Sequence, residues 1–200
     1  EYARGQEVLA TMQRDFADAK LSESSRMSYR LYEYRQARAA RAWPYRDYGY
    51  LFDQMNGAQS ELPAFLINIH RIDNESDALA YIDRIRGMGP LLDALSAQSA
   101  SRAGKGIMPP KWVYPFLLSD MGNMTKTGSG AAMTGHPGID DFRERLAKTS
   151  IADARKVELA AAAIAAWSGS AAPAYGRLRT EMERQAAMAP SDDGIWRFPD

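Results

Sequence analysis

The sequence has no cysteine among its 200 residues, and this absence excludes several kinds of chemistry. Disulfide bonds, thiolate nucleophiles and thiolate zinc sites all need cysteine, and without it the redox compartment cannot be inferred. Histidine is nearly as scarce, with only His70 and His136 present. Imidazoles alone therefore cannot supply the three protein ligands that a catalytic zinc site uses.

The sequence also lacks an excess of charge and a long apolar run. Twenty-five basic residues balance twenty-five acidic ones, so no overall field draws the chain to nucleic acid or to an anionic membrane surface. The most apolar stretch, Leu159 to Trp167, is far shorter than the roughly 18 to 20 residues of a membrane-spanning helix. We expect a chain with no membrane span and no nucleic-acid partner.

What the sequence does contain is one helical pattern after another. Apolar residues recur at spacings of three and four, and alternation with a period of two is hard to find, which favours an all-α, irregular multi-helix bundle. We expect Gly87 and Gly89–Pro90 to interrupt a helix that begins after Asn74, and Gly169 to stop another. The other helices are expected at residues up to 20, 24–43, 60–69, 91–103, 112–118, 139–148, 151–167 and 173–188.

Domain organisation is predicted from a change in composition. Residues 121–138 hold five glycines, which is typical of a long irregular connection or hinge. We therefore expect an N-terminal helical bundle at residues 1–120, the Gly-rich connection at 121–138, and further helices at 139–200 that pack on the same body as parts of one domain.

None of the candidate catalytic residues lies in a recognisable catalytic motif. His70 lies in NIHRI at a helix end and His136 in GHPG, a mobile turn, and neither has the H-E-x-x-H surroundings of a zinc site. No G-x-S-x-G elbow occurs, and the acidic pair Asp140–Asp141 is best explained as the cap of a helix. We predict no catalytic residue and no metal ligand in this chain.

A run of arginines among tyrosines could be taken for a nucleic-acid-binding face. Because these arginines spread around the expected helix and the chain is neutral, a solvated or salt-bridged surface is the favoured interpretation. Nucleic-acid binding stays as a third, least favoured hypothesis. The arginines are Arg26, Arg30, Arg35, Arg38, Arg41 and Arg46.

A resemblance covers most of the chain. The order QMNG, LPAFL, DALAYIDRI and GIMPP between Gln54 and Pro110 resembles the N-terminal half of the bacterial domain-of-unknown-function 885 family, and DDGIWRFPD is similar to the turn before that family's central region. The family-like positions are Asn56, Gly57, Pro63, Asp77, Tyr81, Arg84, Pro109 and Pro110. The resemblance implies a zincin-type, zinc-dependent metallopeptidase whose H-E-x-x-H helix lies in a C-terminal half that is absent here.

The resemblance yields a functional hypothesis for the chain. It implies the N-terminal helical region of a larger, mostly helical, zincin-like peptidase, which forms scaffold and part of the substrate cleft and is inactive alone. Zinc, a peptide substrate and the missing catalytic half are expected of the full-length parent. The cleft candidates are Tyr48, Gln54, Asn56, Gly57 and His70. The aromatics of the Tyr45–Phe52 loop could instead simply cover the core.

Two further expectations concern class and location. A non-enzymatic helical binding or interaction module is the alternative function, since the chain is foldable and lacks a catalytic set. The chain begins with Glu1, which suggests a trimmed precursor, and we expect a periplasmic or exported protein, with the cytoplasm left open. A truncated chain should also show an apolar patch around Ile195, Trp196 and Phe198.

Overall fold

The computed structural model describes residues 1–17, 20–125 and 133–198, and within these ranges the chain is helical and has no strand. This confirms the all-α class. None of the helices among the described residues combines the length and apolar character that crossing a membrane requires. The helices are α1 (Tyr2–Phe16), α2 (Glu23–Ala42), α3 (Ala58–Asn68), α4 (Glu75–Ala103), α5 (Tyr114–Thr125), α6 (Pro137–Ala147), α7 (Asp153–Ala166) and α8 (Ala172–Met188).

The chain divides into two compact units, Glu1–Tyr48 and Gly49–Asp200. This division lies elsewhere than the Gly-rich segment at 121–138. The first residues of that segment form the last turn of α5, its last two begin α6, and residues 126–132 lie outside the described part. Helices α5 and α6, which directly precede and follow it, belong to the same unit, while the boundaries expected from composition stay a prediction.

The first unit is a hairpin of α1 and α2. Ser22 caps α2 by accepting a hydrogen bond from the backbone N–H of Ser25 at 3.1 Å. Near the open end of the hairpin, Tyr2 stacks on Trp43 of the short 3₁₀ helix Trp43–Tyr45, with ring centroids 4.2 Å apart. No residue of α1 or α2 is buried.

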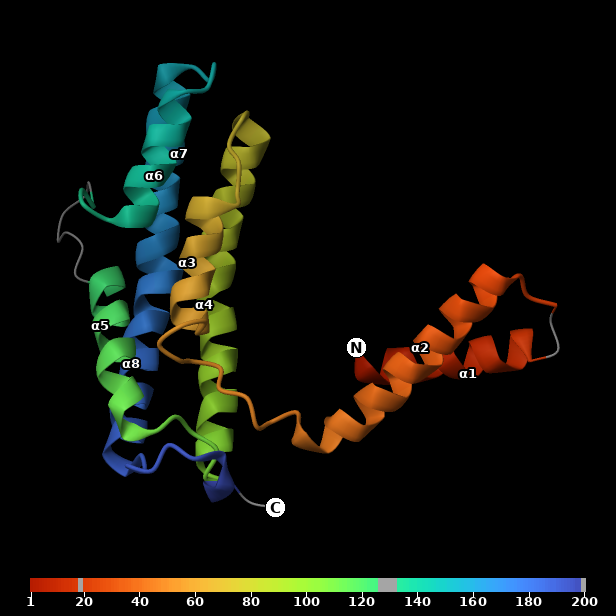
Figure 1. Cartoon of the computed structure of the whole chain (residues 1–200). Coiled ribbons are helices and arrows are strands. Elements are labelled where there is room, and N and C mark those ends of the chain that lie inside the picture. The colour runs from red at the N-terminus through yellow and green to blue at the C-terminus, as the bar shows by residue number, and fades with distance from the viewer. Residues whose placement is uncertain (18–19, 126–132, 199–200) are drawn as a thin grey trace. The chain divides into compact units, whose positions relative to one another are not determined.

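The second unit has one core built around α4. This 29-residue helix packs against α3, α7, α8 and the short segment between the last two, and α5 packs against α8 (Figure 1). Large side chains from several helices are fully buried there, which accounts for most of the apolar burial in the chain. They include Tyr81, Ile82, Ile85, Leu92, Leu117, Phe142 and Tyr175.

Helix α4 runs through Gly87 and Gly89–Pro90, so the expected interruption was wrong. A proline inside a helix leaves the carbonyl four residues earlier without its N–H donor, and here that carbonyl belongs to Arg86. The hydroxyl of Ser170 donates to the Arg86 carbonyl at 2.6 Å. A Cβ on Gly89 would lie only 2.8 Å from the backbone oxygen of Ser170, so the absence of a side chain permits this approach.

In helix α3, a tyrosine hydroxyl supplies the hydrogen bond that an internal proline removes. It begins at Ala58 rather than at Ser60, which places Pro63 inside the helix and deprives the carbonyl of Gln59 of its donor. The buried hydroxyl of Tyr175 on α8 donates to that carbonyl at 2.7 Å. Both internal prolines are thus compensated by a hydroxyl from a neighbouring segment, and both helices continue.

Helices α7 and α8 are joined without a break. The connecting segment Trp167–Ala171 is a π-helix, in which the N–H of Ala172 donates to the carbonyl of Trp167, and Gly169 lies within it. The expected stop at Gly169 was therefore wrong. Because one extra residue is accommodated in the wider turn, α8 continues the same rod past Pro173.

The C-terminal aromatics lie in the second unit, after α8. Trp196 is 78% exposed, and its indole N–H donates to the carboxylate of Asp192 at 3.0 Å. Phe198 is half-buried and meets the ring of Tyr50 edge-on at 6.1 Å. The side chain of Ile195 lies outside the described residues, so the patch expected here is seen only at Trp196.

Candidate functional site

The QMNG turn before α3 is held by a single carboxylate. Asp53 accepts hydrogen bonds from the backbone N–H groups of Met55 and Asn56, each at 2.7 Å, which is an Asx-type turn. The side chains of Gln54 and Asn56 are exposed. The turn is therefore fixed by its own residues while two amide side chains remain available at the surface.

Gly57 is the point where this turn meets α3, and it is buried. A Cβ at this position would lie 2.5 Å from the nitrogen and 2.7 Å from the oxygen of the Asp53 backbone, so only glycine fits. The buried side chain of Gln59 folds back over the turn and donates to the carbonyl of Asp53 at 2.6 Å. Gly57 thus serves the close packing of the turn.

A small groove opens between α3 and α5. Asp120 on α5 accepts hydrogen bonds from the hydroxyl of Ser60 at 3.0 Å and from the amide of Gln59 at 3.4 Å. The groove has a volume of about 290 Å³ and continues past Asn68 and Asn123, whose side chains are exposed. This polar cluster joins α5 to the start of α3.

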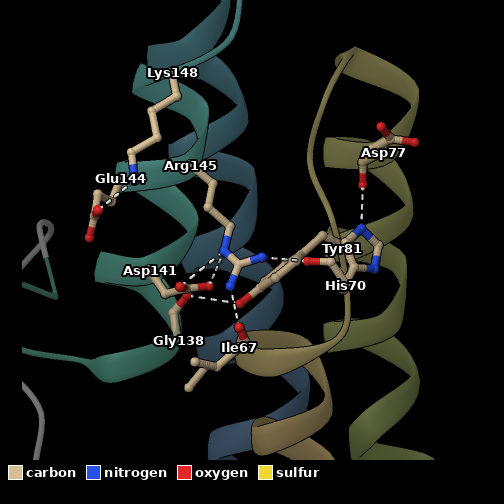
Figure 2. Close-up of polar contacts among 9 residues, drawn as sticks. All are labelled: Ile67, His70, Asp77, Tyr81, Gly138, Asp141, Glu144, Arg145 and Lys148. Atoms are coloured by element: carbon tan, nitrogen blue, oxygen red, sulfur yellow. Dashed lines mark hydrogen bonds and ion pairs between the residues drawn. The ribbon is translucent and has the colours of Figure 1, made fainter.

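His70 lies beyond the other end of α3, and both of its ring nitrogens are occupied. Figure 2 shows the contact with Asp77. Its Nε2–H donates to the backbone carbonyl of Asp77 at 2.9 Å, and its Nδ1 accepts from the guanidinium of Arg84. The ring, 6% exposed, meets the ring of Tyr81 edge-on at 5.1 Å. The carbonyl partner requires the hydrogen on Nε2, which fixes the tautomer.

The electrostatic surroundings keep His70 neutral. Burial lowers the pKa of its imidazole, and the positive charges of Arg84 and Arg145 lower it further, against the opposing effect of Asp77. A neutral imidazole with both nitrogens engaged can bind a metal or accept a proton only after it loses one of these contacts. The geometry is that of a histidine that positions the chain between α3 and α4.

Arg145 on α6 fastens the same region. Its guanidinium donates to the carbonyl of His70 at 2.6 Å and to the carbonyl of Ile67, and pairs with Asp141 at 3.0 Å (Figure 2). The last carbonyls of a helix carry partial negative charge and lack internal donors, so an arginine stabilises this end of α3. The hydroxyl of Tyr81 donates to the carbonyl of Gly138 at 3.1 Å and joins α4 to α6.

His136 is buried, contrary to its interpretation as part of a mobile turn. Its Nδ1 caps α6 by accepting from the backbone N–H of Ile139 at 3.3 Å, and its ring lies 4.1 Å from the ring of Trp167. Burial lowers the pKa of this imidazole, with Asp140 acting in the opposite direction. The cap of α6 is thus His136, while the carboxylate of Asp140, in the first turn, accepts from the N–H of Gly135 before the helix at 2.7 Å.

Within the second unit, the structure does not gather the predicted cleft residues into one place. Tyr48 belongs to the first unit, where its ring meets that of Tyr45 edge-on at 5.5 Å. Gln54, Asn56 and Gly57 precede α3, whereas His70 follows it, and the 11-residue helix separates the two ends by about 16 Å. Their assignment to a substrate cleft stays a prediction.

Sequence reasoning missed the residues that organise both ends of α3. Asp53 had a local signal, because a carboxylate two and three residues before free N–H groups is typical of an Asx turn. Arg145 acts on carbonyls 75 and 78 residues away in the sequence, and Asp120 on side chains 60 and 61 residues away. No local pattern could have revealed those contacts.

Comparison with known proteins identifies a larger relative. A solved structure described as a "putative lipoprotein" from Colwellia psychrerythraea is similar to this chain, with a TM-score of 0.69 and 27% sequence identity. The similarity covers 75% of this chain and 25% of that one, so the chain spans about a quarter of the length of this relative. No curated protein sequence matches. The profile of the bacterial proteins of unknown function called DUF885 matches residues 1–200, and the chain therefore belongs to this family.

Proposed function

We propose that this chain is the N-terminal helical region of a larger bacterial zinc-dependent peptidase. It builds scaffold and part of the wall of a substrate cleft, while the reaction centre belongs to the rest of the polypeptide. The observation that carries the proposal is the length of the solved relative, about four times the part that the similarity covers. The segments between Gln54 and Pro110 resemble the N-terminal half of the DUF885 family, and the resemblance of that family to zincin-type enzymes supplies the chemistry.

The residues that the structure describes do not fit a zinc site. His70 has both nitrogens engaged, and His136 is buried against Trp167 as a helix cap. Among the described residues, no three histidine or carboxylate side chains come together as a metal-binding group. We derive no catalytic step for this chain, and zinc belongs in our proposal to the remainder of the parent.

The turn before α3 is the part of this chain that suits contact with a substrate. Its backbone is fixed by Asp53 and Gln59, and it presents the exposed amides of Gln54 and Asn56, which can both donate to and accept from a peptide backbone. Tyr48, Gly57 and His70 complete the proposed set, with Gly57 and His70 acting through their hold on the chain.

The cellular compartment of the parent is also proposed from the solved relative. The description of the Colwellia protein as a lipoprotein supports a periplasmic or exported parent, with the cytoplasm as the alternative. Alkaline phosphatase fused to the end of the parent would be active in the periplasm and inactive in the cytoplasm.

The test compares the full-length parent with the 200-residue chain. We expect the parent to hydrolyse peptides, to lose activity with a chelator and to regain it with zinc, and the chain alone to be inactive. In the parent, replacing Asn56 by Ala should raise KM more than it lowers kcat if the turn contacts substrate. Metal-dependent hydrolysis by the chain alone would refute the proposal.

A non-enzymatic binding module is the alternative, and the exposed apolar residues of α2 favour it. Met27, Leu31 and Tyr34 are all more than half exposed. The downstream reading frame separates the two functions, because an H-E-x-x-H segment there favours the peptidase and an immediate stop codon favours the module.

A further inference from the structure

Helix α2 has two opposite faces, and only one of them has a partner in the first unit. At 100° per residue, Tyr32, Gln36 and Ala39 share one side of the helix, and all three are half-buried. This side contacts α1, because Tyr32 donates to the carbonyl of Gly5 at 3.3 Å and Gln36 accepts from the amide of Gln6 at 3.3 Å. Among the described residues of this unit, the opposite side has no such contact with α1.

An apolar stripe runs along that opposite side. Met27, Leu31 and Tyr34 follow each other at positions i, i+4 and i+7, the spacing of one helical face. Their exposed fractions are 67%, 55% and 58%. Neither helix of the hairpin buries any residue, so the hairpin does not gain from its own packing the stability that a core supplies.

The stripe is flanked by positive charge. Arg30, Arg35, Arg38 and Arg41 are exposed, and none of them has a hydrogen bond or ion pair with another described residue. The only acidic residue between Ser24 and Ala42 is Glu33, which lies toward α1 and accepts from the amide of Gln13 at 3.0 Å. This side of α2 is therefore apolar from Met27 to Tyr34 and cationic beside and beyond that stretch, where Arg38 continues the line of the stripe.

We propose that this face of α2, made of Met27, Leu31 and Tyr34 with the four arginines, docks into an apolar groove edged by carboxylates on the remaining part of the parent polypeptide. The inference rests on our proposed function only in taking the chain as part of a longer protein. The relative, about four times as long as the matched part, has ample chain to supply the groove. Such a groove would bury the stripe and pair the arginines.

The overall charge argues against the other partners that arginines could attract. The chain has no net charge, so no long-range field directs it to nucleic acid or to anionic lipid. A protein groove needs only local complementarity, which the stripe offers through three apolar side chains and four cations.

Oxidation of Met27 by hydrogen peroxide, followed by mass spectrometry, tests this directly. Met27 should oxidise rapidly in the 200-residue chain and about tenfold more slowly in the intact parent, where the groove covers it. Buried Met182, 1% exposed, serves as the slow reference within each protein. Leu31→Glu in the parent should restore rapid oxidation, whereas Thr11→Glu, at an exposed position of α1 outside the stripe, should not.

Several outcomes would overturn the inference. Equal oxidation in chain and parent would show that the parent leaves the face open. Slow oxidation in the chain alone would place the cover within the chain or, if it depends on concentration, in a second copy. Rapid oxidation in the parent that slows only with phosphatidylglycerol vesicles or duplex DNA would identify those as the occupant. An inactive parent with protected Met27 would refute the peptidase proposal and support docking.

Discussion

Helices α2 and α4 differ sharply in burial although both carry regular apolar spacing. None of the 20 residues of α2 is buried, whereas α4 buries nine of its 29, including Tyr81, Ile82 and Ile85. The difference lies in their neighbours, because α4 contacts α3, α7 and α8 while α2 packs on α1. Apolar periodicity thus indicates which face of a helix can be covered, and the number of packed neighbours decides whether it is.

The largest expected change in stability comes from replacing a buried leucine, compared with an exposed leucine in the other unit. Leu117 is fully buried and Leu31 is 55% exposed. In the 200-residue chain, Leu117→Ala should lower the free energy of unfolding by about 2 to 5 kcal/mol, because it leaves a cavity in the core. Leu31→Ala should change it by about 0.5 kcal/mol or less. Urea denaturation measures both, and similar losses would mean that the exposed face of α2 is covered in the isolated chain.

Two glycines of α4 provide a finer comparison within the second unit. Gly87→Ala should stabilise the protein by about 0.5 to 1 kcal/mol, since nothing lies within 4 Å of the new methyl group and alanine favours the helix. Gly89→Ala should destabilise it by about 1 to 3 kcal/mol, because the methyl group would meet the backbone of Ser170. Thermal unfolding of the two variants should shift in opposite directions, and a shift in the same direction would refute the close-approach argument.

Removing the Tyr175 hydroxyl, which compensates for Pro63, should have a smaller effect on stability, and replacing Pro63 as well should reduce that effect. Tyr175→Phe should cost about 1 to 2 kcal/mol, because the buried carbonyl of Gln59 loses its donor. The same change should cost less in a Pro63→Ala background, where residue 63 supplies an N–H to that carbonyl. A double-mutant cycle by urea unfolding measures the coupling, and additive costs would show that the two positions act independently.

The smallest expected effect is a pH dependence confined to the second unit. The pKa values of His70 and His136 are lowered in the folded chain, so the unfolded chain binds protons first as the pH falls. Stability from the two neutral rings is complete above a pH of about 6.5, the ordinary histidine pKa, and is lost as the pH falls toward the folded values. His136→Asn, which keeps a cap but does not titrate, should flatten this acid-side loss in calorimetry.

How much could be predicted from the sequence depended on the range of the interactions. The all-α class followed from local spacing, and so did the limits of α2, because Ser22 to Ser25 and Pro44 are local signals. The stop at Gly89–Pro90 was wrong because a donor far along the chain replaces what the proline removes. The stop at Gly169 was wrong because a π-helical turn carries the chain through the glycine. A hydroxyl 84 residues from Arg86 cannot be foreseen from the residues around Pro90.

In the candidate site too, short-range features could be predicted from the sequence and long-range contacts could not. The exposed turn at Gln54–Gly57 could be located from its sequence, and its internal carboxylate bonds are short-range. The roles of His70 and His136 could not be assigned, since Arg84, Arg145 and Trp167 reach them only through the fold. Both histidines have structural partners.

The wide turn at Trp167–Ala171 also bears on how family members should be aligned. A residue added to an ordinary helix rotates everything after it by about 100°, which would carry Tyr175, Leu178 and Met182 away from the core. Here the surplus residue is absorbed locally, so the azimuth of α8 is preserved. Homologues whose rod is a regular α-helix should therefore differ by a one-residue gap within 167–171, and an ungapped alignment through this point would misassign every position downstream.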